Sequence, residues 1–97
     1  MNLEMNDALM HFKSWRDSAA LLRVTLAEEG NTVISPCRIV VVGDTSLFAS
    51  ATADAHTFEV RRLDDADFDL SGDPLGTVLE LSWDDGRACR FELLKAA

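Results

Sequence analysis

The strongest constraint on the fold lies in residues 77–94, where apolar and polar side chains alternate on both sides of the turn sequence Asp84-Asp85-Gly86. A β-hairpin with these three residues as its loop gathers the large apolar side chains on one face. The opposed residues on that face are Leu79 with Phe91, Leu81 with Cys89, and Trp83 with Arg87. Gly86 then occupies the left-handed position that such a loop needs.

A two-residue loop of Asp85 and Gly86 gives a different register. It would set Leu81 against Arg90 and Glu80 against Phe91, which mixes apolar and polar side chains on both faces. The three-residue loop instead places Glu80 opposite Arg90 on the outer face. Because one face of the hairpin must be buried, the hydrophobic pattern favours this register.

Length and charge limit the classes of function. The chain has 97 residues, which predicts a single domain over residues 1–97, too small for both a core and a large enclosed active site. The net charge of -8, from 9 basic and 17 acidic residues, argues against nucleic acid and anionic membranes as partners. Residues 1–20 contain neither a secretory signal nor an apolar span, so we expect a cytoplasmic protein.

The N-terminal segment has helical periodicity. Its apolar residues recur at steps of three and four, which predicts an amphipathic helix over about residues 4–17 with Asn2 or Asn6 as its cap. The stripe consists of Met5, Ala8, Leu9, Phe12, Trp15 and Ala19. We expect it to pack on a β-meander that covers about residues 19–94.

The segment after this helix has two interpretations. Residues 22–26 alternate like a strand, and a loop at Glu28-Glu29-Gly30 would pair Leu26 with Thr32 and Val24 with Ile34. Alternatively, residues 19–27 extend the helix to about 25 residues over five strands, an order of elements that resembles Sm-like proteins. RNA binding would not follow from that order, because the basic surface is missing.

The next segments predict further strands. Pro36 interrupts residues 31–42, so we expect a strand break there with a bulge, a bend or an exposed edge. A tight turn at Gly43-Asp44 would pair Val40 with Leu47 and Ile39 with Phe48, which makes residues 38–42 a central strand that is apolar on both faces. A strand over residues 56–63 follows, with Phe58 and Val60 inward.

Residues 64–76 are predicted to be an irregular, mobile acidic loop. The segment carries five aspartates, Gly72, Pro74 and Gly76. Phe68 and Leu70 would anchor it against the sheet. Together these segments predict an α+β fold, in which one N-terminal helix packs on a six-stranded (alternatively five-stranded), mostly antiparallel meander that curls into a small barrel or bent sheet.

Metal and nucleophile sites have little support. Asp65, Asp67 and Asp69 alternate like calcium ligands, but Leu70 and Gly76 stand where an EF-hand needs glycine and glutamate. The potential zinc ligands are Cys37, Cys89, His11 and His56, which lack close pairing such as CxxC. We therefore expect no metal, no cofactor and two buried thiols.

A weak resemblance concerns a nucleotide-binding family. Arg61-Arg62 followed by Asp69-Leu70-Ser71-Gly72 is weakly similar to PilZ domains, six-stranded barrels that bind a cyclic dinucleotide through an RxxxR segment and a later [DN]xSxxG strand. Here the arginines are adjacent, Pro74 replaces the last glycine, and the two segments are too close. We do not assign the family. The two arginines are explained more simply as exposed residues that balance the charge of Asp64 and Asp65. Surface ion pairs of this kind contribute about 0 to 1 kcal/mol to stability.

The tip of the hairpin is the most specific candidate surface. Trp83 and Arg87 are expected to be neighbours there and could line an open barrel end. Together with Arg61 and Arg62 they form the candidate ligand or interaction surface. We expect a non-catalytic protein-interaction module that binds a protein partner or itself, as a homodimer or larger homo-oligomer. The alternative is a small-ligand or nucleotide-binding barrel, and an enzyme is least favoured.

Overall fold

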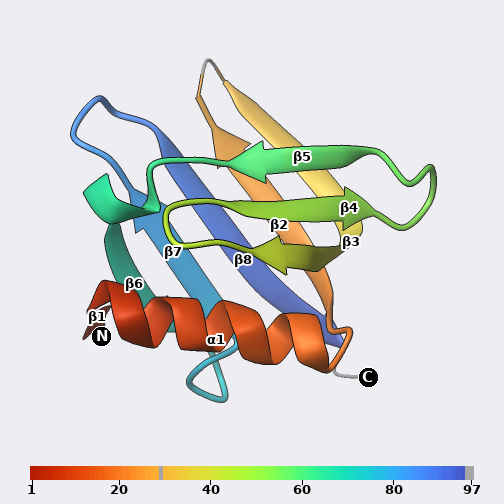
Figure 1. The fold of residues 1–97 in the computed structure, drawn as a ribbon, viewed down its shortest axis with the longest axis horizontal. Coiled ribbons are helices and arrows are strands. Elements are labelled where there is room, and N and C mark those ends of the chain that lie inside the picture. Colours follow the sequence, from red (N-terminus) through yellow and green to blue (C-terminus); the bar gives the residue numbers. More distant parts are fainter. Residues whose placement is uncertain (29, 96–97) are drawn as a thin grey trace.

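The computed structural model describes residues 1–28 and 30–95. Within them lie one α-helix, α1 (Met5–Asp17), one short 3-10 helix, η1 (Leu63–Asp65), and eight strands (Figure 1). The strands are β1 (Asn2–Leu3), β2 (Leu21–Ala27), β3 (Asn31–Val42), β4 (Leu47–Ala51), β5 (Thr57–Val60), β6 (Asp67–Ser71), β7 (Val78–Ser82) and β8 (Ala88–Lys95). The α+β prediction is confirmed, and residues 21–27 are a strand, so the extended-helix alternative was wrong.

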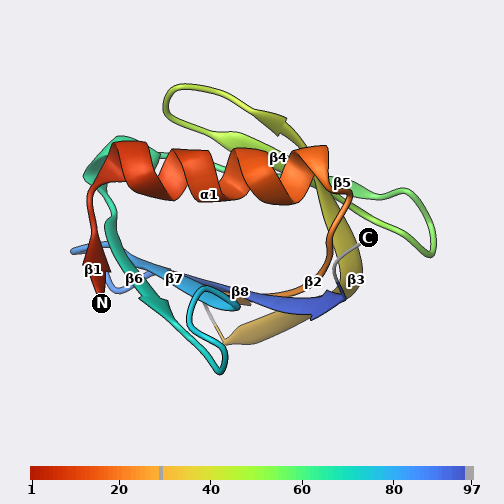
Figure 2. The ribbon, with the colours of Figure 1, turned by 90° about the horizontal axis from the view of Figure 1, so that it is seen from below.

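All strands belong to one antiparallel sheet with the order β1-β6-β7-β8-β2-β3-β4-β5. The sheet bends strongly around α1, which crosses its concave side (Figure 2). The two end strands do not pair with each other, so of the two predicted forms, a small barrel or a bent sheet, the barrel was wrong. The prediction of six or five strands was also too low.

The two missed strands lie at the start of the chain and inside the predicted acidic loop. β6 occupies residues expected to be irregular and pairs with both β1 and β7. Phe68 and Leu70 point inward from β6 and are buried, as expected. The prediction of an irregular loop over residues 64–76 was wrong for residues 67–71, because these two apolar side chains and the ladders to β1 and β7 make that part a strand. Alternating aspartates obscured this pattern.

The β7–β8 hairpin has the register derived from the sequence. Leu79 lies opposite Phe91, Leu81 opposite Cys89, and Glu80 opposite Arg90. The backbone N–H of Trp83 donates to the carbonyl of Arg87 at 3.0 Å and closes the loop. Gly86 has φ +91°. The three-residue loop is therefore confirmed.

The β2–β3 hairpin also has the predicted register, with Leu26 opposite Thr32 and Val24 opposite Ile34. Glu29 in its predicted loop lies outside the described residues. At Pro36 the strand does not break. β3 continues through Pro36 with a bulge. The bulge is seen in the register, which shifts between Leu22 and Val24 on the partner strand β2. The bulge accommodates the residue that cannot donate to the ladder.

The β3–β4 turn differs from the prediction. Val42 lies opposite Leu47 and Val41 opposite Phe48, so the connection has four residues, closed by a hydrogen bond of 2.8 Å from Gly43 N–H to Ser46 O. A second bulge follows between Ile39 and Val41. Val40 and Val41 are 46% and 51% exposed. These two valines are therefore open to solvent, although the sequence predicts a central strand that is apolar on both faces.

The inner face of α1 packs into the concave side of the sheet. Ala8, Phe12 and Trp15 are buried, and the rings of Phe12 and Phe91 meet edge to face at 4.9 Å. Neither predicted asparagine caps the helix. Glu4 occupies the cap position without a side-chain hydrogen bond, because the two-residue strand β1 places Asn2 in the sheet.

The C-terminal end of α1 is set by backbone geometry. Ala19 adopts φ +52°. Its N–H donates to Arg16 O, and the N–H of Ala20 donates to Trp15 O. This is the double hydrogen bond of a helix end that usually carries glycine at the left-handed position. It turns the chain from α1 into β2 and ends the helix at Asp17, as the sequence predicted.

Candidate functional site

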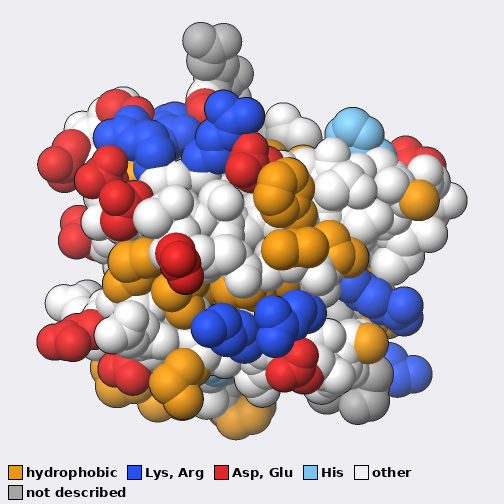
Figure 3. All heavy atoms as spheres, in the orientation of Figure 1, with side chains coloured by type: hydrophobic (Ala, Val, Ile, Leu, Met, Phe, Trp, Pro, Cys, Tyr) orange, Lys and Arg blue, Asp and Glu red, His pale blue; other side chains and the backbone are white. Residues whose placement is uncertain are grey.

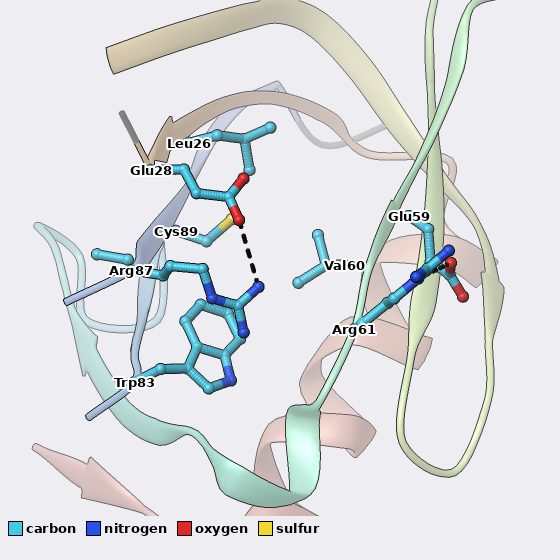
Figure 4. Close-up of a pocket in the computed structure, with 9 residues that line it drawn as sticks. Leu26, Glu28, Glu59, Val60, Arg61, Trp83, Arg87 and Cys89 are labelled. Atoms are coloured by element: carbon cyan, nitrogen blue, oxygen red, sulfur yellow. Dashed lines mark hydrogen bonds and ion pairs between the residues drawn. The ribbon is translucent and has the colours of Figure 1, made fainter. Parts of the chain in front are cut away.

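A cleft of about 240 Å³ lies between the end of β5 and the tips of the β2–β3 and β7–β8 hairpins (Figure 4). It occupies the part of the concave side away from α1. Its lining is mixed, with apolar groups at the floor and charged groups at the rim. The lining residues are Leu26, Glu28, Glu59, Val60, Arg61, Trp83, Arg87, Ala88 and Cys89.

One wall of the cleft is a cation–π pair. Trp83 is 8% exposed, and the guanidinium carbon of Arg87 lies 4.8 Å from the centroid of its ring. The two residues flank the hairpin loop and face each other because that loop has three residues. The sequence predicted this neighbourhood, and Figure 4 shows the guanidinium stacked on the indole and facing the space toward Val60. Such a pair contributes about 0.5 to 2 kcal/mol.

The charge of Arg87 is already balanced within the site. Its Nε donates to Asp85 at 3.0 Å, and its Nη1 donates to Glu28 at 3.4 Å. The backbone N–H of Arg87 also donates to Asp85, and this hydrogen bond lowers the pKa of that carboxyl group below its usual 3.8. The remaining donor, Nη2, is buried and has no hydrogen-bond partner among the described residues.

The other two predicted site residues follow β5. The side chain of Arg61 lines the edge of the cleft but turns toward Glu59, away from Arg87 (Figure 4). Arg62 lies outside the lining. Its carbonyl accepts a hydrogen bond of 2.7 Å from the indole N–H of Trp83, and its guanidinium pairs with Asp65 at 3.1 Å.

The free edge of β5 borders the same cleft. β5 pairs with β4 on one side, in a register without bulges, and ends the sheet on the other. Ala51 N–H donates to His56 O, and hydrogen-bonded pairs alternate with non-bonded pairs in an antiparallel ladder. The backbone of Thr57 and Glu59 therefore points out of the sheet, whereas that of Phe58 and Val60 points to β4.

The nucleophilic and metal-binding groups do not assemble into a reactive centre. Cys37 and Cys89 are buried free thiols. Burial raises the pKa of Cys37 to about 11 and raises the pKa of Cys89 further. Protonated thiols are poor nucleophiles. The described residues hold no group of three or more His, Cys, Asp or Glu placed to bind a metal.

The two histidines have separate positions. Nε2 of His11 on α1 lies 2.9 Å from the carbonyl of Gly76. His56 is exposed at the start of β5. Neither residue lines the cleft.

The segments that resemble PilZ motifs lie on different parts of the sheet. Arg61 follows the edge strand β5, whereas Asp69 is on β6, where it contacts the amino group of Met1 at 2.9 Å. Four strands, β7, β8, β2 and β3, separate β6 from the β4–β5 pair. Basic and acidic side chains are interspersed on the face shown in Figure 3, so that face has no continuous basic surface.

Sequence reasoning missed three parts of the cleft: Glu28, Val60 as its opposite wall, and the free edge of β5. Val24, Leu26 and Glu28 alternate on one face, but Glu28 was assigned to a loop. Its contact with Arg87 depends on the pairing of β2 with β8, which joins segments far apart in the chain. Hydrophobic alternation gives no signal for such a pairing.

The comparisons with family models, with curated proteins and with solved structures find no match for this chain. No α-helix of the described residues has the length and apolar character needed to cross a membrane. The absence of nucleic-acid and membrane partners and the cytoplasmic location stay predictions.

Proposed function

We propose that this protein is a non-catalytic protein-interaction module that binds an extended segment of another protein by adding it as a strand to the free edge of β5. The observation that carries the proposal is the juxtaposition of that edge with the cleft: Glu59, Val60 and Arg61 form both the outer edge of the sheet and one side of the cleft. Strand addition obtains affinity from main-chain hydrogen bonds and specificity from an adjacent pocket.

The edge has the properties that strand addition requires. β5 contains no proline, no lysine and no bulge, which are the usual features that protect an edge from pairing. The opposite end of the sheet differs. β1 has two residues, and the amino group of Met1 is held by Asp69 and by the carbonyl of Leu70. We therefore place the partner at β5 and not at β1.

The size of the cleft favours a peptide over a small-molecule ligand. Its volume of about 240 Å³ is below the range of about 300 to 1,000 Å³ that is typical of small-molecule sites. A second copy of the chain is also a poor occupant, because each copy carries a net charge of -8 and like charges repel. A segment of a different protein fits both observations.

The test uses selection of short random linear peptides on the full chain, followed by binding measurements on two variants. Glu59→Pro removes an outward backbone N–H and leaves the ladder with β4 intact, because proline is tolerated where the N–H faces away from the neighbouring strand. Glu59→Ala is the matched control, since it removes the same carboxylate and the same pair with Arg61 but keeps the N–H.

We expect enriched peptides to bind the natural chain and Glu59→Ala with similar affinity and to lose at least tenfold in affinity for Glu59→Pro. Equal binding to all three proteins, or no enrichment at all, would contradict strand addition at β5. Light scattering of the free protein is the second readout. A stable dimer that Glu59→Pro dissociates would show that a second copy occupies the edge instead.

A further inference from the structure

The cleft beside β5 has features that identify the part of a ligand it would hold. A strand added to the edge of β5 would lie beside Glu59 and Val60. The side chain of Val60 points inward and is 5% exposed. Side chains of neighbouring strands in register point to the same face. Every second residue of an added strand would therefore face the cleft.

The floor of the cleft is apolar. Leu26 and Cys89 lie opposite each other on β2 and β8, and Val60 faces them across the cleft (Figure 4). The indole of Trp83 forms an adjoining wall. Water at this floor has few polar partners, because the charged side chains lie at the rim, so an apolar side chain would displace that water favourably.

Charge on the rim disfavours a charged occupant. The guanidinium of Arg87 is already paired with Glu28 and Asp85, and Asp85 is also 3.5 Å from Arg62. Because these charges are already paired with one another, an entering carboxylate or cation would have to displace an existing ion pair to gain a partner.

We propose that the cleft is a specificity pocket that accepts one large, uncharged apolar side chain, of the phenylalanine or leucine class, from the strand added to β5. This inference rests on the proposed function and adds the chemistry of the ligand. The cation–π pair of Trp83 and Arg87 acts as a rigid wall of the pocket and is not a binding site for an anion.

The test uses blocked peptides of the sequence KTTXTTK, in which X is Phe, Leu, Ala, Glu or Lys. Threonine favours the extended conformation, and the central position faces the cleft when the peptide is in register. Binding is measured by the shifts of amide signals on the natural chain, on Glu59→Pro and on Leu26→Trp. The last variant fills the floor of the pocket and leaves the edge of β5 open.

We expect the Phe and Leu peptides to bind about tenfold or more tightly than the Ala peptide, since burying a large apolar side chain contributes on this scale. Leu26→Trp should abolish that preference and leave the Ala peptide unchanged. The pocket assignment would be overturned if all five peptides bound with equal affinity, or if the Glu or Lys peptide bound best, while Glu59→Pro still weakened binding. That result would leave strand addition at β5 intact. If Glu59→Pro changes none of the affinities, the proposed function itself fails.

The folded state of each variant is checked in the same spectra. If Leu26→Trp unfolds the chain, the smaller Leu26→Phe replaces it, and Cys89→Leu is a second filling variant on the same floor. Arg87→Lys keeps the charge but removes the planar stack on Trp83. We expect this variant to lose more affinity for the Phe peptide than for the Ala peptide. An equal loss of affinity for both peptides would contradict the role of the stack as a wall of the pocket.

Discussion

The indole N–H of Trp83 donates a hydrogen bond of 2.7 Å to the carbonyl of Arg62, which ties the tip of the β7–β8 hairpin to the chain just after β5. These segments are far apart in the order of the sheet. Arg62 adopts φ +59°, an uncommon conformation for a residue other than glycine. The bond therefore joins two segments that no strand pairing connects, and it holds Trp83 in the wall of the cleft.

Replacing Trp83 by phenylalanine tests this bond. Trp83→Phe keeps an aromatic ring but leaves the part-buried Arg62 carbonyl without its donor, so we expect the free energy of unfolding to fall by about 1 kcal/mol or somewhat more. Chemical denaturation measures the change. Arg62→Ala is the control because it keeps the carbonyl and loses only exposed ion pairs. A larger loss for Arg62→Ala than for Trp83→Phe would contradict the assignment.

The two faces of the β7–β8 hairpin should respond differently to truncation. Leu81 is 1% exposed, and Leu81→Ala should cost about 2 to 5 kcal/mol. Glu80 forms an exposed pair with Arg90 at 3.9 Å, so Glu80→Ala should cost less than about 1 kcal/mol. Equal effects in chemical denaturation would show that the faces are wrongly assigned.

The end of α1 offers a stabilising substitution. Ala19 sits at φ +52°, where an alanine is strained and glycine is not. We expect Ala19→Gly to raise the free energy of unfolding by about 0.5 to 1 kcal/mol, because the relieved strain exceeds the added chain entropy of glycine. Ala20→Gly, one residue further at a buried position, should destabilise. Thermal unfolding compares the two variants, and destabilisation by Ala19→Gly would contradict the left-handed helix end.

The buried thiols predict a loss of stability at alkaline pH. Burial raises the pKa of Cys37 from 9.0 to about 11 and raises the pKa of Cys89 as well. Thiols in the unfolded chain ionise first, so the stability that their neutral forms provide is complete below pH 9.0 and declines as the pH rises toward about 11. The sequence has no tyrosine, so no phenol titrates in this window.

Denaturation at several pH values between 8 and 11 measures this slope. The control is the double variant Cys37→Ala, Cys89→Ala, which should be less stable throughout but show a shallower decline over the same range. Parallel declines in the two proteins would show that the thiols make no contribution.

Much of the fold could be predicted from local patterns. The registers of β7–β8 and β2–β3 follow from apolar alternation around acidic turns, and the stripe on α1 follows from helical spacing. Two features could not be predicted in this way. β6 alternates aspartate with Phe68 and Leu70, so its composition resembles that of a loop. The β3–β4 register depends on a bulge between Ile39 and Val41, which a strict period of two cannot represent.

The candidate site was predictable only in part. Trp83 and Arg87 are neighbours because of one hairpin, so sequence was sufficient to place them together. The pairing of β2 with β8 brings Glu28 to Arg87, and the bend of the sheet brings Val60 opposite Cys89. Both are long-range consequences of the topology. Arg61 lies at the edge of the cleft, but its side chain turns away because Val60 takes the inward position.

The most direct test of strand addition is amide hydrogen exchange in β5, with and without a saturating amount of the tightest peptide from the selection. In the free protein, the amides of Phe58 and Val60 should be protected and those of Thr57 and Glu59 should exchange rapidly. Peptide binding should then protect Thr57 and Glu59. Protection of these two amides in the free protein, or their continued rapid exchange with the peptide bound, would contradict the assignment of β5 as the docking edge.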